Sequence, residues 1–108
     1  MMTYQNFING KWIKSTSGKS VPNINPGNTD DIIADTPLAT REEARQAVEA
    51  AAEAFRGWRS TPAPTRGRIV GKAARLMEEH KDELAQILTR EEGKTIAESR
   101  GELQRSIN

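Results

Sequence analysis

The tripeptide Gly93-Lys94-Thr95 is similar to the end of a P-loop, a motif that binds phosphate. In a P-loop, glycines let backbone amides point at phosphate oxygens, and the following lysine reaches the same group. The motif also requires a glycine five positions before Gly93, where this sequence has Leu88 in a stretch of helical periodicity. We therefore predict that Gly93 ends one helix in the left-handed conformation and that Thr95 caps the next.

The sequence lacks the residue combinations that metal binding and acid–base catalysis need. His80 is the single histidine, without partners at the spacing of a metal site or catalytic dyad, and we predict a partly exposed side chain near a helix C-terminus. There is no cysteine, hence no thiolate ligand, disulfide or cysteine nucleophile in these residues. Neighbouring carboxylates on a helix point in different directions, so we predict solvated surface for the adjacent pairs. These pairs are Asp30-Asp31, Glu78-Glu79 and Glu91-Glu92.

Basic residues recur at helical spacing in the stripe Arg68, Lys72 and Arg75, with Arg59 and Arg66 nearby. A nucleic-acid groove usually adds stacking aromatics and a clear positive excess, whereas the net charge here is +1. We predict a solvated face or partners for neighbouring acids, with an anion- or coenzyme-facing patch in a larger protein as the alternative. Trp12 and Trp58 are predicted to be packing anchors, with ligand stacking as the alternative.

The size and composition predict a small domain or a piece that shares its core with further sequence. The chain has 108 residues, of which 35% are apolar and 5% aromatic. The N-terminus lacks the pattern of a signal peptide, and no apolar run is long enough to cross a membrane. We expect a cytoplasmic protein that binds neither nucleic acid nor membrane.

Residues 1–38 predict a hairpin and short extended segments. Apolar runs flank Asn9-Gly10, the strongest short hairpin signal, because both turn residues must tolerate a positive φ. Pro22 and Pro26 keep the next segment extended, and 31–35 is expected to be a strand that ends before Pro37.

Residues 40–108 have the period of a helix and predict about four helices. Thr40 and Glu43 have capping-box spacing, so the first helix should start there and run to about Phe55. Gly57, Pro62 and Pro64 form the expected break. The second helix is predicted over 65–80 and the third over 82–92. On the second helix, the expected buried side comprises Ile69, Ala73, Leu76 and Met77.

The fourth predicted helix begins with a second capping box, Thr95 with Glu98. Its apolar stripe of Ile96, Leu103 and Ile107 stops at Asn108 with no clear C-cap, which leaves up to four carbonyls without intrahelical partners. We therefore expect the chain to be interrupted there.

Several segments, in this order, resemble the opening of the aldehyde dehydrogenase superfamily. They are Phe7-Ile8-Asn9-Gly10-Lys11-Trp12, Asn25-Pro26, the extended stretch to Ala39-Thr40, residues 47–58 (AVEAAAEAFRGW), residues 66–77, and residues 91–102 (EEGKTIAESRGE). The resemblance covers essentially the whole chain and implies an α/β enzyme of the aldehyde dehydrogenase fold. Residues 1–108 would be the N-terminal part of its coenzyme-binding domain, with 1–38 as hairpin and extended segments, 40–108 as helices, and the Rossmann-type sheet following later.

The resemblance implies an NAD(P)-dependent oxidation of an aldehyde to a carboxylic acid by a homo-oligomer. In the family, a cysteine attacks the aldehyde, hydride passes to the nicotinamide, and a glutamate assists hydrolysis of the thioester. These residues lie beyond the equivalent of Asn108, so no catalytic, cofactor-binding or metal-binding residue maps onto this chain, and we expect it to be inactive alone and to bind no cofactor. Residues 62–72 resemble relatives that oxidise semialdehydes such as 2,5-dioxovalerate or succinate semialdehyde.

A small stand-alone helical module without enzymatic activity, which binds a protein partner through an exposed apolar helix face, is the alternative. Such a module predicts cooperative unfolding and a monodisperse species.

Overall fold

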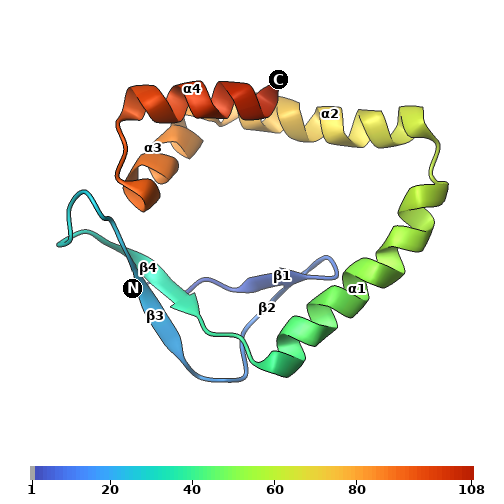
Figure 1. Cartoon of the computed structure of the whole chain (residues 1–108), viewed down its shortest axis with the longest axis horizontal. Coiled ribbons are helices and arrows are strands. Elements are labelled where there is room, and N and C mark those ends of the chain that lie inside the picture. Colours follow the sequence, from blue (N-terminus) through green and yellow to red (C-terminus); the bar gives the residue numbers. More distant parts are fainter. Residues whose placement is uncertain (1) are drawn as a thin grey trace. The chain divides into compact units, whose positions relative to one another are not determined.

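The computed structural model describes residues 2–108, which form four short strands followed by four helices (Figure 1). This confirms the predicted order of hairpin, short strands and about four helices. The elements are β1 (Asn6–Ile8), β2 (Lys11–Ile13), β3 (Ser20–Ile24), β4 (Ile32–Pro37), α1 (Arg41–Ser60), α2 (Ala63–Glu79), α3 (Lys81–Glu92) and α4 (Ile96–Ile107).

The chain divides into two compact units. The first comprises the chain up to Asn23 together with Ala34–Thr61, and the second comprises Ile24–Ile33 together with Pro62–Asn108. The first unit therefore contains β1, β2 and α1, and the second contains α2, α3 and α4.

β1 and β2 form the predicted antiparallel hairpin. Asn9 and Gly10 have φ of 52° and 77°, as a two-residue type I′ turn requires. The register pairs Phe7 with Trp12, and their ring centroids are 4.9 Å apart. Turn chemistry and an aromatic cross-strand pair thus fix the same register.

β3 and β4 form a second two-stranded sheet. β4 runs to Pro37, so the prediction of a strand over 31–35 ending before this proline was wrong at both ends. In a two-stranded sheet each strand is an edge, where a proline without an N–H donor is tolerated. The Leu38 amide then donates to the Lys19 carbonyl at 2.9 Å.

α1 begins at the predicted capping box and is longer than predicted. The Thr40 hydroxyl accepts from the Glu43 amide, and the Glu43 carboxylate accepts from the Thr40 amide. The helix continues through Gly57 to Ser60, so Phe55 is not its end and Gly57 is not part of a break. The helix stops where Thr61 turns extended (ψ 131°), because a residue before proline avoids the helical region.

α2 begins two residues earlier than predicted and contains Pro64 in its first turn. A proline is accommodated there because the first amides of a helix have no intrahelical acceptor. α2 and α3 are separated only by His80, which has φ −105° and ψ 18°.

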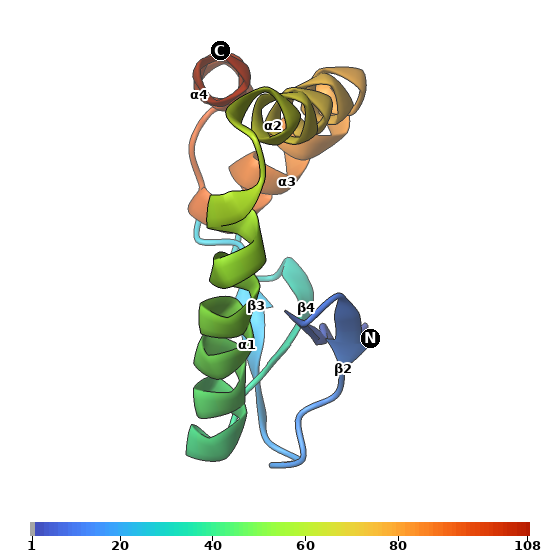
Figure 2. The same ribbon diagram turned by 90° about the vertical axis from the view of Figure 1, so that its right-hand side faces the viewer.

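The second unit has its core between α3 and α4. Ala85, Ser99 and Leu103 are buried, and the Thr89 and Ser99 hydroxyls form a 2.7 Å hydrogen bond between the two helices. Figure 2 shows α4 nearly end-on beside α2. Ala85 and Ser99 are not among the predicted core residues, because the periodicity of large apolar side chains does not identify the small residues that permit close helix packing.

The prediction of a buried side on α2 was wrong. Ile69 is 52% exposed, Leu76 is 47% exposed and Ala73 is exposed, while Met77 is half-buried. α3 and α4 pack against α2 but leave this side uncovered. The apolar face of α1 is open as well, with Val48 at 69% and Phe55 at 57% exposure.

Candidate functional site

Gly93-Lys94-Thr95 is a junction between two helices. Gly93 has φ 78° and donates its amide to the Thr89 carbonyl at 2.8 Å, and the Thr95 hydroxyl accepts from the Glu98 amide. Both predicted caps are therefore confirmed. A glycine is required at position 93 by its left-handed backbone and also by a close contact, since a Cβ atom there would lie 2.9 Å from Pro26 Cγ.

Lys94 lies between two carboxylates. Its Nζ contacts Glu92 Oε2 at 2.7 Å and also Glu102 Oε2. The hydrogen bonds that Lys94 donates to Glu102 and then to Glu92 raise the pKa of Lys94, and the bond to Lys94 lowers the pKa of Glu102. An ammonium group neutralised in this way is occupied within the chain, which argues against a phosphate-binding role.

Asp31 joins the turn at 25–31 to the end of α3. Arg90 donates from Nη2 to Asp31 Oδ1 at 2.6 Å and from Nε to Oδ2 at 2.9 Å, and Asn25 Nδ2 donates to Oδ2 at 3.1 Å. These bonds, with Arg90 making the largest contribution, lower the pKa of Asp31 to about 2. The Asp31 carboxylate therefore holds two segments of the second unit together.

Glu43 is the most heavily hydrogen-bonded carboxylate of the first unit. Besides closing the capping box, it accepts from the Thr16 amide at 2.6 Å, the Thr16 hydroxyl at 2.8 Å and the Ser15 hydroxyl at 2.8 Å. The backbone hydrogen bonds from Thr16 and Thr40 are the main reasons why its pKa is lowered to about 2. Glu43 thus ties the segment after β2 to the start of α1.

The prediction that the adjacent carboxylates are solvated surface was wrong for Asp31, which is half-buried and pairs with Arg90. Glu92 is exposed, as predicted, and its carboxylate accepts from Lys94. The ion pair of Asp31 with Arg90 spans 59 positions, so no local spacing indicates it. The sequence predicts only the capping role of Glu43, and nothing in the sequence around it indicates its bonds to residues 15 and 16.

The further candidates His80, Trp12 and the basic stripe on α2 are exposed. His80 is exposed, and its Nδ1 lies 3.2 Å from Glu83 Oε2. The basic stripe on α2 is exposed, and within residues 2–108 none of its three members forms an ion pair, although Arg68 donates to the Thr65 hydroxyl at 3.1 Å. Trp12 is 69% exposed and contacts Phe7.

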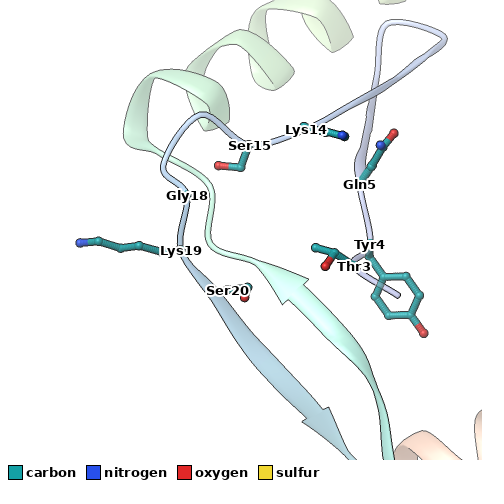
Figure 3. A pocket seen from close by; sticks show the side chains of 8 residues that line it. All are labelled: Thr3, Tyr4, Gln5, Lys14, Ser15, Gly18, Lys19 and Ser20. Carbon is teal, nitrogen blue, oxygen red and sulfur yellow. The ribbon is translucent and has the colours of Figure 1, made fainter. Parts of the chain in front are cut away.

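A hollow in the first unit is lined mainly by polar residues (Figure 3). It is lined by Thr3, Tyr4, Gln5, Lys14, Ser15, Gly18, Lys19 and Ser20. In Figure 3 the Lys19 and Tyr4 side chains point away from the others, and Ser15 is already bonded to Glu43. Lys14 and Lys19, the two charged residues that line the hollow, point in different directions in Figure 3.

Ion pairs form within both units of the described part of the chain. Residues 2–108 contain no group of three or more His, Cys, Asp or Glu side chains able to hold a metal ion. The charge clusters around Asp31, Lys94 and Glu43 each connect segments of the same unit.

The sequence profile of the aldehyde dehydrogenase family matches residues 12–108. Malonate-semialdehyde dehydrogenase 3 of Geobacillus kaustophilus is 49% identical over 97% of this chain and 22% of its own length. The alpha-ketoglutarate semialdehyde dehydrogenase of Haloferax volcanii is 42% identical over 96% of this chain and 22% of its own length. The chain therefore belongs to the aldehyde dehydrogenase family, as its ordered motifs predict.

A solved structure has the same fold. A point mutant of betaine aldehyde dehydrogenase from Staphylococcus aureus, in complex with NAD+, superimposes with a TM-score of 0.91 at 32% identity, covering 99% of this chain and 22% of that chain. The predicted aldehyde dehydrogenase fold is thereby confirmed. The chain spans about a fifth of the length of the relatives it matches.

Proposed function

We propose that residues 1–108 are the N-terminal part of the coenzyme-binding domain of an NAD(P)-dependent aldehyde dehydrogenase that oxidises a semialdehyde. The main support for this proposal is that nearly the whole chain matches 22% of the length of each of two enzymes whose names include a semialdehyde. The NAD+ complex of the betaine aldehyde dehydrogenase supports the choice of coenzyme class. The role of these residues is then that of a scaffold.

The side chains of residues 2–108 do not fit the coenzyme. Lys94, the one lysine in a phosphate-loop-like context, is paired with Glu92 and Glu102. The basic stripe on α2 is exposed and has no glycine-rich turn beside it. We therefore assign no catalytic, cofactor-binding or metal-binding residue to positions 1–108, and derive no reaction step from them.

The exposed apolar sides of α1 and α2 agree with a scaffold role. Val48, Phe55, Ile69, Val70 and Leu76 are each 47–69% exposed, an unusual amount of large apolar surface for a chain of 108 residues. In a larger dehydrogenase these sides would be covered by the rest of the fold, and the stability of α1 and α2 would depend on it.

Enzyme assays test the activity. The purified 108-residue chain, incubated with NAD or NADP and malonate, succinate or alpha-ketoglutarate semialdehyde, should give no NAD(P)H above the enzyme-free control. Sequencing the gene downstream of the Asn108 codon should reveal the cysteine and the glutamate of the family, and the product of that whole gene should reduce coenzyme with a semialdehyde. Turnover by the 108-residue chain alone would contradict the scaffold role. Preference of the whole product for acetaldehyde over every semialdehyde would contradict the substrate class.

We also propose a cytoplasmic homo-oligomer with a small-molecule substrate and no nucleic-acid or membrane partner. The net charge of +1 supports the absence of a polyanion partner. In the described residues, no helix is long and apolar enough to cross a bilayer. Retention on immobilised DNA at low salt would contradict the first point, and a monomeric whole gene product in sedimentation would contradict the oligomer.

A stand-alone interaction module remains the second candidate, favoured by the same exposed apolar sides. It predicts a sharp cooperative melt and a monodisperse species. A scaffold segment predicts association and a broad melt. A thermal melt and a sedimentation measurement on one sample separate the two.

A further inference from the structure

We draw no further inference here: the strongest candidate, the apolar surface that the β1–β2 hairpin and α1 expose around Phe7, Trp12, Val48 and Phe55, carries nothing because nothing in the structure shows what covers it.

Discussion

Arg90 holds Asp31 through two parallel hydrogen bonds, Nη2 to Oδ1 at 2.6 Å and Nε to Oδ2 at 2.9 Å, across 59 positions of sequence. Two-point pairing of this kind fixes the orientation of both groups as well as their distance. It lies beside the contact of Gly93 with Pro26 and Gly27. The turn at 25–31 is therefore attached to the end of α3 at two neighbouring points.

Replacing Asp31 by Asn should lower the urea midpoint of unfolding. The substitution removes the charge that Arg90 pairs with and replaces a carboxylate oxygen that Asn25 donates to. Asp30→Asn is the matched control, since Asp30 is exposed and forms no ion pair within residues 2–108. Added salt should shrink the difference between the two variants, because ions screen a partly exposed pair. Equal midpoints for the two variants at low salt would show that the bridge does not stabilise the fold.

Acid should destabilise the chain between about pH 5 and about pH 2. Asp31 and Glu43 have pKa values lowered from 3.8 and 4.5 to about 2 in each case. A carboxyl with a depressed folded-state pKa stabilises the fold above its unfolded pKa, and this contribution is lost as the pH falls through the folded value. Circular dichroism melts across this range should show a falling midpoint.

The double variant Asp31→Asn, Glu43→Gln is the control for this pH dependence. It should be less stable than the parent at pH 7, and its midpoint should fall less between about pH 5 and about pH 2. A parallel fall in both proteins would assign acid sensitivity to other carboxyl groups.

The sequence predicts the elements whose signals are local. Four such signals, each contained within a few residues, occur in the structure as predicted. They are the turn at Asn9-Gly10, the capping boxes of Thr40 with Glu43 and of Thr95 with Glu98, and the C-cap at Gly93. The sequence does not predict the ends at Ser60 and Pro37, because α1 tolerates a glycine in its interior and an edge strand tolerates a proline.

Long-range pairs and burial could not be predicted from local spacing. The bonds of Asp31 to Arg90 and of Glu43 to residues 15 and 16 exist only because the fold brings separate segments together. The apolar pattern of α2 correctly marks one side of a helix, yet the pattern cannot tell which element, if any, covers that side. Ile69 and Leu76 therefore have a periodicity typical of a core while about half of each residue is exposed.

Gly93→Ala should destabilise the chain, whereas Gly101→Ala should not. A side chain in the left-handed region costs about 1–2 kcal/mol. A Cβ atom at position 93 would also approach Pro26 Cγ at 2.9 Å and the Gly27 nitrogen at 3.1 Å, which adds to that cost. Gly101 lies within α4, where an added Cβ atom would meet no other atom within 4 Å, so alanine there should stabilise by up to about 1 kcal/mol through helix propensity. Urea unfolding of both variants measures the contrast, and a neutral Gly93→Ala would mean that the turn moves away at little cost.

Truncation to alanine should cost much more stability at Leu103, in the core of the second unit, than at Ile69, on its uncovered side. Leu103 is 8% exposed, so its truncation should cost about 2–5 kcal/mol by leaving a cavity between helices. Ile69 is 52% exposed, so its truncation in the 108-residue chain should change the free energy of unfolding by about 0.5 kcal/mol or less. In the product of the whole gene, Ile69→Ala should become markedly more destabilising if the rest of a dehydrogenase covers α2. A cost for Ile69→Ala that is equally small in both proteins would mean that this side of α2 faces solvent in the enzyme too.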